Sequence, residues 1–87
     1  MTKKKLESLD GKEIRIEWLE DVELEVVESV DKKDNIKSSM ETFLKGTTID
    51  VDVYGIDEKP QTVDVQFGDG SVVTRLPTKV FKVKEIL

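Results

Sequence analysis

The feature that most constrains the fold of this chain is an alternation of apolar and charged residues between positions 13 and 26. Six apolar residues fall there on even positions: Ile14, Ile16, Trp18, Val22, Leu24 and Val26. A period of two, rich in β-branched side chains, is typical of strands that bury one face. We expect strands over residues 13–18 and 22–26. A helix over residues 17–30, within an α+β roll, is the alternative, because several of these residues also recur every four positions.

Two strands that bury even-numbered residues on a shared face predict an odd-numbered loop between them. Residues 19–21 provide the simplest such loop, and the resulting hairpin would place Trp18 opposite Val22 and Ile14 opposite Val26. Val27 departs from the parity, so we expect a bulge or bend near Val26 and Val27.

The middle of the chain has a different pattern. Residues 31–35 form a polar segment that predicts a turn, after which Ile36, Met40, Phe43 and Leu44 fall at helical spacing. Ser38 and Glu41 resemble a capping box, and Gly46 follows as a stop. We expect one or two helical turns over residues 38–45, or an irregular loop packed through Met40 and Phe43.

The C-terminal half predicts four strands, over residues 47–54, 62–67, 72–76 and 80–85. Asp69 and Gly70 are typical of a two-residue type I′ turn, which would pair Val63 with Leu76 and Asp64 with Arg75. Residues 55–61 contain glycine and proline and predict a loop. The inward residues are Ile49, Val51 and Val53 in the first of these strands, Val63, Val65 and Phe67 in the second, and Phe81 and Val83 in the last.

Residues 47–87 resemble the second half of an SH3-like small barrel of the Tudor or KOW type. The resemblance is carried by the strand pair around residues 68–71 and by the segment Leu76-Pro77-Thr78-Lys79 before a closing strand. It implies an all-β domain, an SH3-like barrel or roll of five to six short antiparallel strands with a short helical turn in the middle connection. Such folds bind proline-rich peptides, modified side chains, RNA or ribosomal partners. We expect one domain over residues 1–87, with residues 1–8 as a flexible tail.

Composition excludes several kinds of chemistry. The 87 residues contain neither cysteine nor histidine, so disulfides, thiol catalysis, imidazole catalysis and zinc sites built on these ligands are ruled out. No apolar stretch reaches the roughly 18 residues of a membrane span, and the basic start lacks the apolar segment of a secretory signal. The charge is −5, from 14 basic and 19 acidic residues. We therefore expect a cytoplasmic protein, bacterial or phage in character.

Three sets of exposed residues are candidates for binding. Tyr54 lies on the polar parity of its strand, so we expect it to be an exposed aromatic contact. The acidic candidates, from a stretch without a base over residues 17–28, are Glu17, Glu20, Glu23 and Glu25. The basic candidates, near the C-terminus, are Arg75, Lys79, Lys82 and Lys84. Charges of either kind also keep strand edges soluble without having a partner.

Asp50, Asp52 and Asp64 are candidates for a shared carboxylate cluster on the outer face of the sheet. Asp50, Asp52 and Gly55 match the first, third and sixth positions of a calcium-binding loop, but Tyr54 and Gln61 occupy positions where such a loop needs ligands. We therefore expect no metal, no cofactor and no catalysis.

These observations predict a non-enzymatic module that binds another protein, as a monomer or a weak oligomer. One alternative is a nucleic-acid-associated module that uses the basic residues. Another is an acidic DNA mimic or inhibitor that uses the acidic residues. With a net charge of −5, nucleic-acid binding is the less favoured of these expectations.

Overall fold

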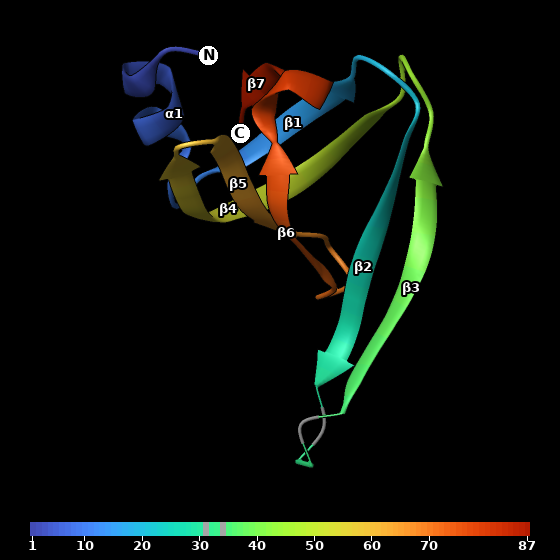
Figure 1. Ribbon diagram of the computed structural model, residues 1–87. Coiled ribbons are helices and arrows are strands. Elements are labelled where there is room, and N and C mark those ends of the chain that lie inside the picture. The colour runs from blue at the N-terminus through green and yellow to red at the C-terminus, as the bar shows by residue number, and fades with distance from the viewer. Residues whose placement is uncertain (31, 34) are drawn as a thin grey trace.

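The computed structural model describes residues 1–30, 32–33 and 35–87 and consists of one antiparallel sheet with a short N-terminal helix. The sheet has seven strands in the order β3-β2-β6-β5-β4-β1-β7 (Figure 1). The elements are α1 (Lys3–Leu9), β1 (Glu13–Trp18), β2 (Val22–Val30), β3 (Ile36–Phe43), β4 (Thr48–Glu58), β5 (Gln61–Gln66), β6 (Val72–Pro77), the 3-10 turn η1 (Thr78–Val80) and β7 (Phe81–Ile86).

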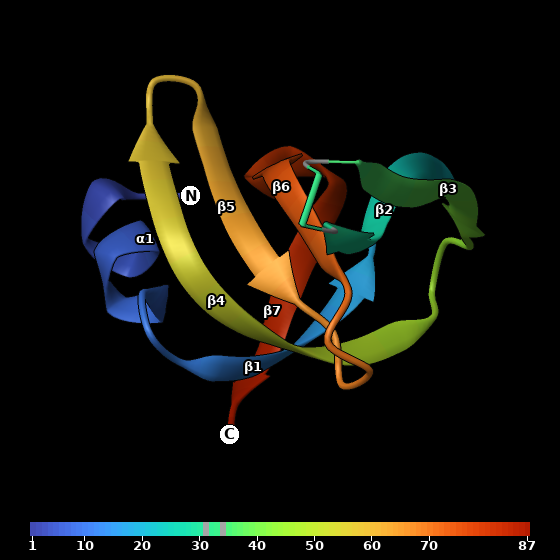
Figure 2. The ribbon, with the colours of Figure 1, turned by 90° about the horizontal axis from the view of Figure 1, so that it is seen from below.

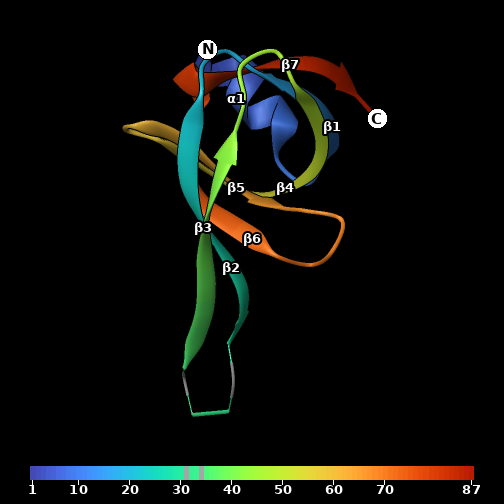
Figure 3. The ribbon, with the colours of Figure 1, turned by 90° about the vertical axis from the view of Figure 1, so that its right-hand side faces the viewer.

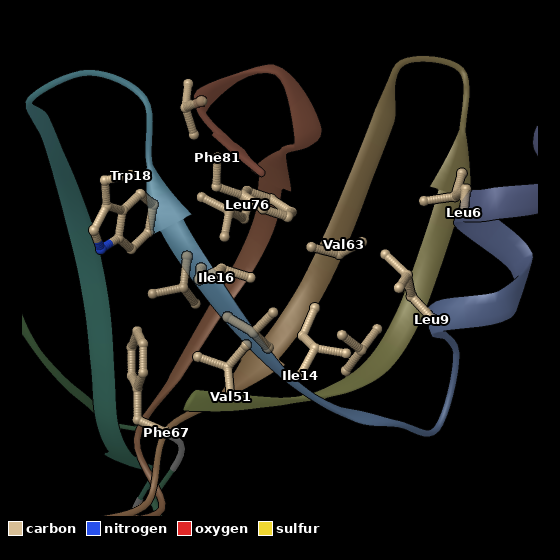
Figure 4. Packing of buried hydrophobic residues seen from close by; sticks show 14 of the residues in the cluster. Leu6, Leu9, Ile14, Ile16, Trp18, Val51, Val63, Phe67, Leu76 and Phe81 are labelled. Atoms are coloured by element: carbon tan, nitrogen blue, oxygen red, sulfur yellow. The ribbon is translucent and has the colours of Figure 1, made fainter. Parts of the chain in front are cut away.

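The alternating strands bury the predicted face. In β1, Ile14, Ile16 and Trp18 are buried while the residues between them are not, and Val51 and Val53 of β4 follow the same rule. The sheet curls around these side chains (Figure 2), and helix α1 adds Leu6 and Leu9 to the core that it encloses (Figure 4). A curled sheet can bury much of one face because its own strands cover it.

The all-β class is therefore confirmed, and the alternative helix over residues 17–30 is wrong. Seven strands form instead of five or six, and the sheet stays open, with β3 and β7 as its two edges. Closure into an SH3-like barrel is thus not observed. The expected short turn before the last strand is present as η1.

The predicted hairpin between β1 and β2 is wrong. β1 lies between β4 and β7, with Ile14 opposite Val51 and Trp18 opposite Phe81. The chain returns to β1 later, where the N–H of Gly46 donates to the carbonyl of Trp18 at 2.8 Å. Alternation sets which face of a strand is buried but not which strand lies beside it, and both arrangements bury the same even-numbered residues.

The predicted helical turn over residues 38–45 is also wrong, because this segment forms β3. It pairs with β2 along its length, and Phe43 lies opposite Val22. Phe43 turns toward the core, where its ring centroid is 4.8 Å from that of Trp18. A spacing of four residues fits a strand face as well as a helix face, since four is a multiple of two. Residues 31 and 34 of the expected polar turn lie outside the described residues, and Lys32 and Lys33 form a turn.

The predicted flexible tail is replaced by helix α1. Thr2 caps the helix by accepting a hydrogen bond from the Lys5 N–H at 3.1 Å. Leu6 and Leu9, three residues apart on one face, are completely buried and point into the same core as Ile14 and Val63 (Figure 4). The N-terminal segment is therefore part of the hydrophobic core.

The β5–β6 hairpin has a three-residue loop, so the predicted type I′ turn is wrong. The Gly70 N–H donates to the Phe67 carbonyl at 3.0 Å, and Gly70 has a φ of +91°. This geometry is a turn followed by a bulge residue in the left-handed region. The register is shifted near the loop, with Val65 opposite Val73, but Val63 still lies opposite Leu76 as predicted.

Two further bulges shape this part of the sheet. The register shifts between β4 and β5 next to Gly55, and between β5 and β6 next to Arg75, whose φ is +55°. The loop predicted over residues 55–61 is shorter than expected, because β4 continues to Glu58 and only a tight turn at Lys59 and Pro60 separates it from β5.

Candidate functional site

The β2–β3 hairpin, residues 22–43, extends from the body as an arm (Figure 1). The molecule is correspondingly elongated, with principal extents of 39 × 25 × 25 Å. Among the described residues, β2 is paired with the body at Val27 alone, which lies opposite Val72 of β6. Beyond that point, in the described residues, β2 pairs only with β3. A two-stranded segment of this kind exposes far more of its surface than a strand inside a sheet.

One face of the arm anchors it to the body. Val26 is buried there, and Val22, Leu24 and Phe43 pack against the core. Phe43 lies between the rings of Trp18, at 4.8 Å, and Phe67, at 5.8 Å. These apolar contacts fix the base of the arm.

The opposite face, here called the outer arm face, is exposed. Residues opposite one another in an antiparallel pair share a face, and alternate residues of a strand do so too. The face therefore consists of Glu23, Glu25, Val27 and Val30 from β2 and Ile36, Ser38, Met40 and Thr42 from β3. The register shifts between Val27 and Ser29, close to the bulge that the sequence predicted.

The outer arm face combines apolar and acidic side chains. Val30, Ile36 and Met40 are 60%, 63% and 57% exposed. Glu23 and Glu25 lie nearer the body, and neither has an ion-pair partner among residues 1–30, 32–33 and 35–87. Exposed apolar patches that are rimmed by polar residues often mark surfaces that bind a partner.

The predicted acidic set is divided by the fold. Glu17 lies on β1 rather than on the arm, and its carboxylate binds Lys84 at 3.5 Å and Lys82 at 3.7 Å. Glu20 is exposed in the turn before β2. Only Glu23 and Glu25 remain together on one face.

The predicted basic set is divided as well. Lys82 and Lys84 lie on β7, and both form ion pairs with Glu17 of β1. Arg75 lies on β6, and Lys79 lies in η1. Two of the four candidates are thus paired with an acidic side chain, which weakens the attraction that this set would offer to phosphate.

The three candidate aspartates do not form a cluster. Asp50 binds the Arg15 guanidinium at 2.8 and 3.2 Å, and this hydrogen bonding lowers the pKa of the Asp50 carboxyl. Asp52 lies two residues beyond Asp50 along β4, opposite Glu13 of β1 and Gln66 of β5. Across the described ranges, no three acidic side chains gather as ligands for a metal ion.

Asp64 has a structural position at the two bulges of the sheet. Its carboxylate accepts a hydrogen bond from the backbone N–H of Arg75 at 2.9 Å. The two residues are therefore close, as predicted, but the contact is made by the main chain of Arg75. The same carboxylate approaches Gly55, where a Cβ atom would lie 2.6 Å from Asp64 Oδ2. Tyr54 is 51% exposed beside it, and partial burial together with the Asp64 charge raises the pKa of the Tyr54 hydroxyl.

We expect Gly55→Ala to destabilise the protein by about 1–3 kcal/mol, because the new methyl group would displace the Asp64 carboxylate from the Arg75 N–H. Gly68→Ala is the matched control, since nothing lies within 4 Å of a Cβ there. Urea unfolding of the two variants measures the difference. Equal stability of both would show that Asp64 does not brace the bulges.

Two adjoining hollows lie on the body, away from the outer arm face. Their volumes are about 390 and 360 Å³, and they share Pro60, Thr62 and Pro77. Lys79 lines the first, and Lys59 and Arg75 line the second with Asp57. Sequence reasoning missed them because their walls come from segments brought together by pairing, with Thr62 opposite Pro77.

No helix in the described residues is long and apolar enough to cross a membrane. No family model, curated protein or solved structure matches this chain.

Proposed function

We propose that this protein is a non-enzymatic binding module that contacts another protein through the outer arm face. The observation that carries the proposal is the exposure of Val30, Ile36 and Met40 on one side of an arm that extends beyond the body. Burying a fully exposed side chain of this size contributes roughly 1.5–3 kcal/mol, and these three are each about three-fifths exposed, so covering all three contributes roughly 3–5 kcal/mol and can support specific recognition.

The chemistry of the outer arm face indicates the chemistry of its partner. Apolar side chains lie toward the tip, at Val30 and Ile36, and Glu23 and Glu25 lie toward the base. A complementary protein surface would present apolar residues beside lysine or arginine. Opposite charges at such a contact would increase the association rate and fix its orientation.

Binding rather than catalysis is supported by the causes of the pKa shifts. Arg15 and Asp50 shift each other's pKa values through their ion pair, and hydrogen bonds from Ser71 lower the pKa of the Asp69 carboxyl within its turn. None of these residues lines either hollow, and neither does Tyr54. Catalytic groups typically combine a perturbed pKa with a place in a cleft.

The nucleic-acid alternative has less support. Two of its four candidate residues, Lys82 and Lys84, are paired with Glu17, and the protein carries a net charge of −5. The acidic DNA-mimic alternative is weakened by the same ion pairs, which remove Glu17 from the exposed acidic set. The SH3-like assignment stays part of this proposal, supported by η1 before the last strand and by the pairing of β7 with β1.

Affinity capture from a lysate of the native host tests the proposal with two matched variants. Met40→Lys places a charge on the outer arm face. Leu44→Lys places the same charge just after the end of β3, at an apolar side chain that is 56% exposed, against 57% for Met40. We expect Met40→Lys to reduce the recovered partner protein by about tenfold or more, because the lysine would replace an apolar side chain that the partner covers in the complex. Leu44→Lys should recover it normally.

Treatment of the lysate with nuclease should leave the capture unchanged. Equal recovery by the two variants would contradict the proposed surface. Recovery of nucleic acid alone, lost on nuclease treatment, would favour the alternative based on Arg75, Lys79, Lys82 and Lys84.

A further inference from the structure

The open sheet ends at β3, whose free side faces no other strand in the part of the chain that the structure describes. β3 is the terminal strand of the sheet, and β2 is its only strand neighbour among the described residues. Figure 3, viewed from that side, shows β3 in front of the other strands. The unpaired N–H and C=O groups of an edge strand are a template for the addition of another strand. At eight residues, β3 is long enough for such pairing.

We propose that β3 pairs antiparallel with β3 of a second copy of this chain, about a two-fold axis that passes through Ser39. In this register Lys37 lies opposite the partner's Glu41, and by symmetry Glu41 lies opposite the partner's Lys37. The edge is thus complementary to itself in charge. An isologous contact of this kind closes as a dimer.

The remaining positions of the register also fit together. Ser39 meets its own symmetry mate, which places two small side chains at the centre. Ser38 lies opposite the partner's Met40, so that the exposed thioether gains a neighbour of small size. Shifting the register by two residues would place Lys37 opposite Ser39 or Phe43 and lose both opposite-charge contacts. Cross-strand pairs of opposite charge stabilise a sheet, whereas like charges destabilise it.

The other edge of the sheet lacks this complementarity. On β7, an axis through Val83 would place Lys82 opposite the partner's Lys84. Axes through Lys82 or Lys84 would place each lysine opposite itself. Lysine on an edge strand is a common protection against strand addition. The two edges therefore differ in charge pattern, and only β3 is suited to pairing with itself.

The dimer would extend the proposed function without depending on it. A two-fold axis perpendicular to the sheet keeps equivalent faces on the same side, so the two outer arm faces would form one continuous surface. Two linked sites raise the apparent affinity for a partner that can contact both. Dimerisation is measured on the purified protein alone, so its failure and the failure of partner binding are separate results.

Sedimentation equilibrium of the 87-residue protein, from about 1 μM to 1 mM, tests the proposal. We expect a concentration-dependent dimer. Lys37→Glu and Glu41→Lys should each weaken it by roughly tenfold or more, because symmetry converts two attractive contacts into two repulsive ones. An equimolar mixture of the two variants should form a heterodimer, since every contact between them joins opposite charges. The double variant should dimerise like the unmodified protein.

Glu28→Gln is the control for local effects, because Glu28 binds Lys37 within the same chain at 3.6 Å. It removes that ion pair and should leave the dimer intact. Circular dichroism verifies that each variant is folded. A protein that stays monomeric over the whole range would overturn the proposal, as would single variants that dimerise normally or a mixture that does not associate.

Discussion

Replacing Leu9 with alanine should reduce the free energy of unfolding by about 2–5 kcal/mol, because the side chain is completely buried and its removal leaves a cavity. The total stability expected for 87 residues is about 4–13 kcal/mol, so this loss would remove a large share of it. Leu19→Ala is the matched control, since the same atoms are removed at a side chain that is 41% exposed. Urea unfolding followed by circular dichroism measures both.

The comparison decides whether α1 is part of the core. We expect Leu19→Ala to cost less than half as much as Leu9→Ala, because a partly exposed side chain loses less buried area. Equal and small effects at both positions would mean that α1 does not pack into the hydrophobic core.

Replacing Trp18 with alanine should cost about 3–5 kcal/mol, the largest effect expected for a single side chain of this protein. Trp18 is 1% exposed and links β1 to the base of the arm through Phe43. Its loss should therefore also release the arm from the body, which hydrogen exchange of the β2 and β3 amides would detect as faster exchange.

Tyr54→Ala is the control for the loss of an aromatic ring. Tyr54 is 51% exposed, and we expect less than half of the Trp18 effect. Unchanged exchange in the arm of a folded Trp18→Ala variant would show that the aromatic contacts do not anchor it.

The strands could be predicted from sequence where alternation was clear, but their neighbours could not. Ile14, Ile16 and Trp18 are buried on one face as the period of two indicated. The same pattern was compatible with pairing to β2, because any neighbour that buries alternate residues on the same face of the sheet satisfies it, whether these are even-numbered as in β2 or odd-numbered as in β4. Long-range pairing with β4 and β7 depends on the fold of the whole chain.

The short elements were the least predictable. Helix α1 has only Leu6 and Leu9 as buried residues, too few to show helical periodicity in a short segment. In the hairpin, Asp69 and Gly70 fitted a two-residue turn, but Asp69 instead accepts a hydrogen bond from the N–H of Ser71 at 2.9 Å and supports a three-residue loop. Turn residues restrict a loop to a few types without selecting one.

For the candidate site, the sequence predicted which side chains are exposed but not which of them lie together in the fold. The polar parity of Tyr54 correctly indicated exposure, and Glu23 and Glu25 are exposed together. The sequence could not show that Glu17 is neutralised by Lys82 and Lys84, which are more than sixty residues away along the chain. It also indicated a helix where β3 supplies the exposed Ile36 and Met40.

Hydrogen–deuterium exchange of the protein, alone and with the partner protein that capture identifies, tests the central claim most directly. If the outer arm face is the binding surface, protection should appear in β2 and β3, and the amides beside the hollows around Pro60 and Pro77 should be unchanged. Protection confined to the β4–β5 turn and η1, with β2 and β3 exchanging as in the free protein, would contradict it.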